Sequence, residues 1–184
     1  EVKPTIMVSV PRLFEKIYAR VMDNILAGSS LKKKIFFWAL KVGKACGELT
    51  LRKQPIPGSL RRRRNLAHKL VFSKVLEKTG GRVRFFVSGG APLAKDIAEF
   101  FYALGIVVLE GYGLTESSPV IACNTFDNLK FGTVGKPIPG VEVKIAPDGE
   151  ILARGPNIMK GYYKKEEETR EALEGGWLHT GDIG

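Results

Sequence analysis

The stretch VRFFVSGGAPLAKDIAEFFYALGIVVL, residues 83–109, decides the fold. Residues 83–87 are strand formers, and residues 106–109 form a second such run. Between them, a turn at 88–92 rich in glycine and proline leads into apolar positions at helical spacing over 93–104. A strand, a helix and a strand at this spacing form a βαβ unit, which predicts two parallel strands covered by helices.

Parallel strands deliver their following loops to one edge of the sheet, and ligands of open α/β sheets bind at that carboxyl edge. The first strand is followed by Gly89, Gly90, Ala91 and Pro92, which keep the backbone open to a flat or anionic ligand. A nucleotide base or phosphate would suit this loop. An ordinary tight turn between strand and helix is the alternative.

The second strand runs into a similar loop that carries more functional side chains. Gly111 and Gly113 permit close approach of the backbone, and Tyr112 offers a ring for stacking. Thr115 offers a hydroxyl to a phosphate, and Glu116 offers a hard carboxylate to Mg²⁺. Taken singly, these residues also fit a helix cap, a solvated acid and a partly buried aromatic.

A third candidate lies at the end of the sequence, where Asp182 follows a glycine. An acid in such a turn can accept hydrogen bonds from both hydroxyls of a ribose. The nearby His179 has no partner visible in the sequence, and we interpret it as structural.

The remaining segments are read from periodicity and from turn residues. Glycines and prolines punctuate the chain after residue 130, and a Pro-Asp-Gly turn there closes a hairpin. The predicted helices are 9–27, 31–46, 65–78 and 166–173, and the predicted hairpin strands are 141–145 and 150–154.

Composition indicates a folded chain of 184 residues with 44% hydrophobic content. No run of about 18 apolar residues occurs, and the start has no charged-then-apolar leader, so we expect a cytoplasmic setting. Cys46 and Cys123 stand outside any motif and indicate no disulfide framework.

The net charge of +10 is uneven: residues 1–85 carry +15 and residues 86–184 carry −5. Solvated helix faces with a basic loop would explain this. Nucleic acid is an unlikely partner because no recognisable nucleic-acid fold accompanies the charges. The apolar run within 31–46 is either a buried or an interfacial helix segment, so a peripheral membrane contact through 31–46 and 61–64 stays open.

Six motifs in order give this chain a resemblance to the adenylate-forming (AMP-binding) enzymes. Residues 10–17 and 66–75 are most similar to the branch of long-chain fatty-acid–CoA ligases. The motifs are Ser88-Gly89-Gly90-Ala91-Pro92-Leu93, Gly111-Tyr112-Gly113-Leu114-Thr115-Glu116, Gly132-x-x-Gly135-x-Pro137, Gly149-Glu150-Ile151 with Arg154-Gly155, Gly161-Tyr162-Tyr163, and Trp177-x-x-Thr180-Gly181-Asp182.

The resemblance implies an α/β fold: a partial parallel sheet flanked by helices, then a small antiparallel β segment, within the family's large N-terminal domain. Residues 1–128 would be its helix-rich and βαβ portion, and residues 129–184 its β-rich portion. The implied site has Gly89, Gly90, Ala91 and Pro92 at the adenine and acyl pocket, Tyr112 against adenine, Gly111 and Gly113 near the reacting carboxylate, Thr115 on the α-phosphate, Glu116 on Mg²⁺, and Asp182 on ribose.

The implied reaction has two steps, activation of a fatty acid with ATP to acyl-AMP and transfer of the acyl group to coenzyme A. Activators of aryl, short-chain or amino acids are alternatives within the family, and a basic membrane- or nucleic-acid-binding module is an alternative outside it. Within these 184 residues we find neither the family's phosphate loop before residue 88 nor its C-terminal lid. We therefore expect a fragment with little ligase activity alone.

Overall fold

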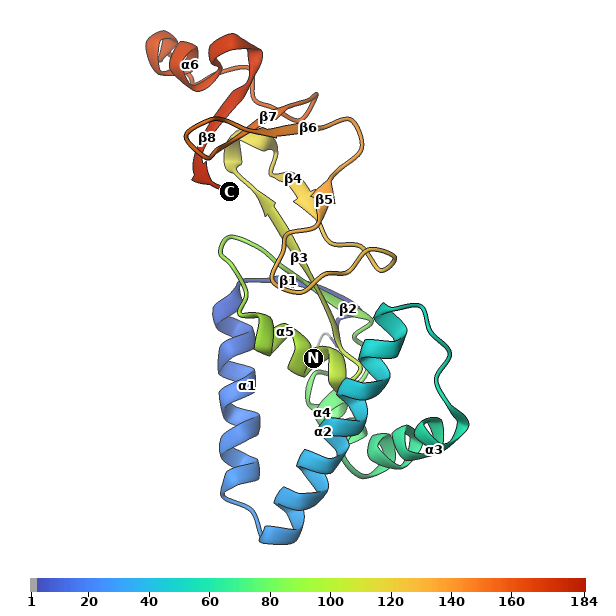
Figure 1. Ribbon diagram of the computed structural model, residues 1–184. Helices are drawn as coiled ribbons and strands as arrows, with labels where there is room; N and C mark the ends of the chain where they lie inside the picture. Colours follow the sequence, from blue (N-terminus) through green and yellow to red (C-terminus); the bar gives the residue numbers. More distant parts are fainter. Residues whose placement is uncertain (1–2) are drawn as a thin grey trace. The chain divides into compact units, whose positions relative to one another are not determined.

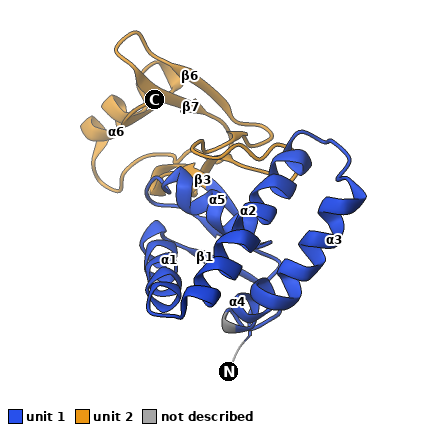
Figure 2. Cartoon of the chain, turned by 60° about the horizontal axis from the view of Figure 1, so that its bottom comes forward, with its two compact units in different colours: residues 1–110 blue, residues 111–184 orange. Residues whose placement is uncertain are grey.

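The computed structural model describes residues 3–184, apart from the side chain of Lys78, and the chain divides into two compact units. The first unit is residues 1–110 and the second is residues 111–184 (Figure 2). The strand β3 (Val107–Gly113) runs from the first unit into the second.

The sheet of the first unit consists of three parallel strands, β1 (Ile6–Ser9), β2 (Phe85–Ser88) and β3 (Figure 1). Ser88 pairs with Ser9 on one side and with Glu110 on the other, so the three strands reach the same edge in register. The helix α5 (Lys95–Ala103) connects β2 to β3. This confirms the predicted βαβ unit. The strand β1 was not predicted from the sequence.

Helices pack around this sheet. The helix α1 begins with proline at its first position, where the missing N–H costs nothing, and α2 begins after Ser29, whose side chain accepts a hydrogen bond from the Lys32 N–H at 3.3 Å. The helical segments are α1 (Pro11–Leu26), α2 (Ser30–Leu51), α3 (Gly58–Ala67), the π-helical turn η1 (His68–Phe72) and α4 (Ser73–Lys78).

Two segments differ from their sequence-based interpretation. Within the apolar run 35–40 of α2, only Phe36 and Ala39 are buried, and Phe37 is 42% exposed, so the run is buried on one side and reaches the surface on the other. The arginines at 61–64 lie inside α3, whereas the sequence predicted a basic loop leading into a helix from residue 65. Arginine has a good helix propensity, and the last proline before it is Pro57, so the helix begins at Gly58.

Aromatic side chains form the core of the first unit. Phe14 of α1 is fully buried and makes edge-to-face contacts with Phe86 of β2 at 5.6 Å and Phe101 of α5 at 5.7 Å between ring centroids. Close helix packing adds to this, since a Cβ on Gly43 would clash with the carbonyl group of Ala103. These contacts fix α1, α2 and α5 around β2.

The second unit is built from short antiparallel strands. The end of β3 pairs with β4 (Val120–Cys123), which pairs with β5 (Lys136–Pro137). The sheet of β6 (Glu142–Ile145), β7 (Glu150–Arg154) and β8 (Leu178–Ile183) contains the predicted hairpin and adds β8, which the sequence did not predict. The short helix α6 (Glu166–Ala172) and the 3₁₀ turns η2 (Thr115–Ser117) and η3 (Glu174–Gly176) complete the unit.

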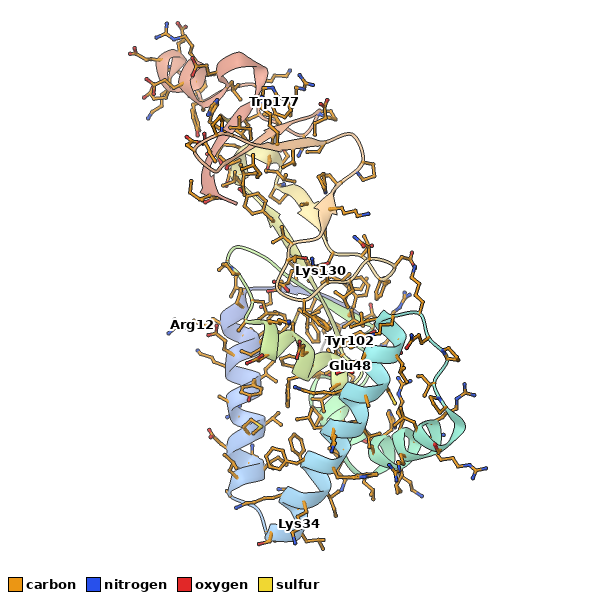
Figure 3. All side chains as sticks on the ribbon, viewed as in Figure 1. Arg12, Lys34, Glu48, Tyr102, Lys130 and Trp177 are labelled. Carbon is orange, nitrogen blue, oxygen red and sulfur yellow. The ribbon has the colours of Figure 1, made fainter. Side chains whose placement is uncertain are left out.

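Trp177 directly precedes β8 in the second unit (Figure 3). Its ring lies beneath Lys144 at 4.1 Å and Arg154 at 4.5 Å. Ile121 and Ala153, both fully buried, belong to the core of this unit. Within residues 3–184, no helix has the length and apolar character needed to cross a membrane.

Candidate functional site

The end of β3 is a tightly packed strand that needs glycine. Gly113 pairs with Val120 across a register shift, and a Cβ at Gly113 would clash with the carbonyl group of Pro119. The strand therefore passes close to the segment before β4, and the chain turns directly after Gly113 into η2. This turn presents Thr115 and Glu116.

Hydrogen bonds from buried polar side chains hold that turn. Ser117 is fully buried, and its hydroxyl accepts from the Leu114 N–H at 2.9 Å. Asn157 donates through Nδ2 to the carbonyls of Ser117 at 3.0 Å and Val120 at 2.9 Å. The Thr115 side chain of this turn is exposed to solvent.

Among the described residues, the Glu116 carboxylate is held through one of its two oxygens. Its Oε1 accepts a hydrogen bond from the Tyr162 hydroxyl at 2.8 Å, and its backbone carbonyl accepts from the Met159 N–H at 2.7 Å. The hydrogen bond to Glu116 raises the pKa of Tyr162. The carboxylate is thus oriented by a donor that stays protonated at neutral pH.

A magnesium ion fits this arrangement. Across the part of the chain that the structure describes, no three His, Cys, Asp or Glu side chains gather into a metal cluster. Mg²⁺ commonly uses only one or two carboxylates and takes its other ligands from water and substrate phosphates. Glu116 alone can therefore supply the protein ligand, and a phosphate-bearing substrate would supply the rest.

Tyr112 and Asp182 meet although 70 residues separate them in the sequence. The Tyr112 hydroxyl donates to Asp182 Oδ2 at 2.8 Å. Burial raises the pKa of Tyr112 to about 12. The neighbouring Asp182 also raises this pKa, whereas a hydrogen bond from Thr180 lowers it. Tyr112 is thus a neutral donor that fixes one carboxylate oxygen of Asp182.

Glu150 holds the turn that carries Asp182. Its Oε1 accepts from the Gly181 N–H at 2.8 Å, and its Oε2 lies 2.8 Å from Nδ1 of His179. The Thr180 hydroxyl donates to the Ile151 carbonyl at 2.7 Å, and the β7–β8 register shifts at this point. His179, for which the sequence offered no partner, is therefore paired with Glu150.

The loop after β2 lies in the first unit. Gly90 has a φ of +81°, which glycine adopts without strain, and the Gly89 N–H donates to the Ser9 carbonyl at 3.2 Å. Ala91 and Pro92 are exposed, and the following helix begins only at Lys95. Among the described residues, the buried Ser88 hydroxyl at the base of this loop has no hydrogen-bond partner.

The structure thus brings together Tyr112 with Asp182, and Glu116 with Tyr162, in the second unit. Sequence reasoning missed the role of Tyr162 and of Glu150 as partners. Both lie within motifs quoted above, but a contact over 46 or 29 positions leaves no local pattern in the sequence.

A parallel sheet with a glycine-rich loop at its edge and a paired tyrosine and aspartate defines a candidate nucleotide-binding protein. The family model of the AMP-binding enzymes matches residues 1–163, and the chain belongs to this family.

Similar proteins include the long-chain-fatty-acid–CoA ligase FadD15 of Mycobacterium bovis, 43% identical over 99% of this chain and 30% of that protein. The peroxisomal long chain acyl-CoA synthetase 7 of Arabidopsis thaliana is 45% identical over 99% of this chain and 27% of its own length. The chain therefore spans less than a third of these relatives.

Solved structures with a similar fold include two proteins named as a coenzyme A synthetase and a CoA ligase. O-succinylbenzoate coenzyme A synthetase (MenE) of Bacillus subtilis, in complex with ATP and magnesium, has a TM-score of 0.53 and 32% identity over 61% of this chain and 27% of that one. The anthranilate CoA ligase AuaEII with anthranoyl-AMP has a TM-score of 0.52 and 27% identity over 55% of this chain and 22% of its own.

Proposed function

We propose that this chain is part of an AMP-forming long-chain fatty-acid–CoA ligase. In the first step, a fatty carboxylate attacks the α-phosphorus of ATP and expels pyrophosphate. In the second step, the thiol of coenzyme A attacks the acyl carbon and expels AMP. Support comes from membership of the AMP-binding family and from relatives, named as long-chain ligases, that align over 99% of the chain.

The observation that carries this proposal is the hydrogen bond between Tyr112 and Asp182. It joins the second and the last of the six motifs, so a ring for the adenine and a carboxylate for the ribose lie together. Tyr112 fixes Oδ2 of Asp182 as an acceptor and leaves Oδ1 for the ribose hydroxyls. This geometry favours a nucleoside over an isolated phosphate.

Charge is the main obstacle to the first step, because a carboxylate and a triphosphate repel each other. In our proposal Thr115 donates its exposed hydroxyl to an α-phosphate oxygen, and Glu116 holds the magnesium ion. When bound, Mg²⁺ supplies positive charge against the phosphate oxygens. Tyr162 keeps the Glu116 carboxylate in place for this role.

Calorimetric titration with a non-hydrolysable acyl-adenylate analogue and Mg²⁺ tests the assignment. We expect binding that weakens in both Thr115→Ala and Asp182→Ala, checked for folding by circular dichroism. Asp127→Ala removes an exposed acid of the same unit, outside the proposed site, and is the matched control. An analogue affinity that is the same in all three variants would refute the site.

We also propose that these 184 residues alone have little ligase activity, since they span under a third of the relatives' length. An assay of acyl-CoA production, compared with the titration of the same chain by the acyl-adenylate analogue, separates catalysis from binding. Acyl-CoA production at roughly 1 per second or faster, a rate within the usual range of enzymes, would contradict this.

A peripheral membrane contact of the basic half is a further proposal. The four arginines at 61–64 are exposed on α3, and residues 1–85 carry a net charge of +15. Such a surface is attracted to anionic lipid headgroups.

A further inference from the structure

A pocket of about 480 Å³ opens between α1, the start of α2, η1 and α4. Its volume lies within the range of small-molecule sites. Figure 3 shows the corner between α1 and α2, where Lys34 is labelled. The lining residues are Val21, Asn24, Ile25, Ser29, Leu31, Lys32, Ile35, Phe36, Leu70, Val71, Lys74 and Val75.

The side chains that line this pocket are mostly apolar, and the charged ones are all positive. Eight of the twelve side chains are apolar, two are lysines, and none is acidic. Leu31 and Leu70 are 67% and 41% exposed, so the pocket has an apolar margin open to solvent.

Lys32 is held at this margin by a hydrogen bond from its Nζ to the Asn24 carbonyl at 3.2 Å. Its positive charge therefore lies beside the apolar lining. Lys74 has no salt bridge among those found in the described residues. Two cations without a lining acid favour an anionic group at this position.

The pocket lies far from the loops at the carboxyl edge of the sheet. The helix α1 starts two residues after β1 ends at Ser9, and Val21 and Ile25 are ten and fourteen residues beyond its first residue. At the helical rise of 1.5 Å per residue, they lie about 15 to 21 Å along the helix. A ligand in this pocket would not place its head group at the carboxyl edge.

We propose that this pocket binds a free single-chain fatty carboxylate as a second, non-reacting ligand. The alkyl chain packs on the apolar lining between α2 and η1, and the carboxylate pairs with Lys32 and Lys74. The argument rests on charge complementarity and on pocket size, and it is independent of the proposed ligase function.

Calorimetry of the 184-residue chain with dodecanoate, kept below its micelle concentration, tests this directly. We expect saturable binding of one dodecanoate per chain. Octanoate should bind at least tenfold more weakly, because each buried methylene contributes about fourfold in affinity. Dodecanol, which keeps the chain but lacks the charge, should also bind more weakly.

Variants locate the site. The double variant Lys32→Gln, Lys74→Gln should weaken dodecanoate about tenfold, since each partly exposed ion pair contributes up to about fivefold. Lys74→Gln alone leaves the Lys32 hydrogen bond intact and guards against misfolding of the double variant. Lys41→Gln, an exposed lysine of α2 outside the lining, should leave the affinity unchanged. Val75→Trp should block binding by filling the pocket.

Three results would overturn the proposal. The first is no saturable dodecanoate binding by a chain that circular dichroism shows to be folded. The second is an equal loss in Lys41→Gln and Lys74→Gln, which would indicate net charge alone. The third is binding to phosphatidylglycerol vesicles with none to monomeric dodecanoate, which would make this face a membrane-docking surface instead.

Discussion

Tyr112 shows how one side chain can join two distant motifs. Its ring packs against the core of the second unit while its hydroxyl meets Asp182. Burial of a phenol disfavours the phenolate, and a neighbouring carboxylate disfavours it further, so both act in the same direction. The neutral hydroxyl is the form that can donate to Asp182.

This predicts a specific dependence of stability on alkaline pH. The pKa of Tyr112 is raised from 10.0 to about 12, so its contribution to stability is complete below pH 10 and is lost as pH rises toward 12. We expect Tyr112→Phe to lose less stability than the parent chain between pH 10 and 12, measured by urea unfolding. Tyr163→Phe removes an 85% exposed tyrosine and is the control. Identical pH profiles for Tyr112→Phe and the parent would contradict the assignment.

Gly113 is a second residue whose identity the structure requires. An alanine there would place its Cβ against the Pro119 carbonyl, which is backbone and cannot rotate away. We expect Gly113→Ala to lower the free energy of unfolding by about 2–3 kcal/mol. Gly58→Ala, where the added Cβ meets open space, should be neutral or slightly stabilising. Chemical denaturation of both variants measures the difference, and equal effects would mean that the β3 end relaxes freely.

At the scale of elements, the turn between His179 and Asp182 depends on β7. Glu150 accepts hydrogen bonds from the Gly181 backbone and contacts His179, so a strand neighbour sets where Asp182 points. Gly181 has a φ of +73°, a conformation that this turn needs and glycine supplies.

We therefore predict that Glu150→Gln weakens binding of the acyl-adenylate analogue about three- to tenfold with little loss of folding. The neutral amide has one accepting and one donating end, so it loses the negative charge that both contacts share, and it keeps the His179 contact only where the ring Nδ1 accepts. Glu142→Gln breaks an exposed salt bridge to Arg154 on the same sheet and should leave the affinity unchanged. Equal affinities for Glu150→Gln and the parent would show that the turn holds Asp182 without Glu150.

The elements also show what periodicity can and cannot predict. The βαβ unit and the hairpin of β6 and β7 were predictable because each has a local pattern closed by a turn. The strands β1 and β8 were not, since their partners β2 and β7 lie far away in the sequence and β8 contains Gly181. The residues Tyr112, Glu116 and Asp182 were predicted as site candidates, but their partners lie far away in the sequence and only folding reveals them.

At the scale of the whole chain, charge separates the first half from the second. The surplus of +15 in residues 1–85 stands against −5 in residues 86–184. Four consecutive arginines on a helix cannot face one way, because successive residues are about 100° apart. Arg64 is exposed but also lines a pocket together with Cys46 of α2 and Tyr102 of α5, so its side of α3 lies nearer to the neighbouring helices.

This orientation makes the proposed membrane contact testable within a single helix. Arg61 is three residues from Arg64 and shares its side, whereas Arg62 and Arg63 flank Leu66, which is 50% exposed. We expect Arg62→Gln, Arg63→Gln to weaken binding to phosphatidylglycerol vesicles about tenfold or more, since each basic residue near an anionic surface contributes about 1 kcal/mol.

The double variant Arg61→Gln, Arg64→Gln removes the same charge from the same helix and should change vesicle affinity by less than about threefold, because its side chains would meet the lipid less closely. Co-sedimentation with vesicles at rising salt measures both variants, and the difference should vanish near 1 M, where the Debye length is about 3 Å. Equal losses in the two variants would show that α3 acts through net charge and presents no particular face to the membrane.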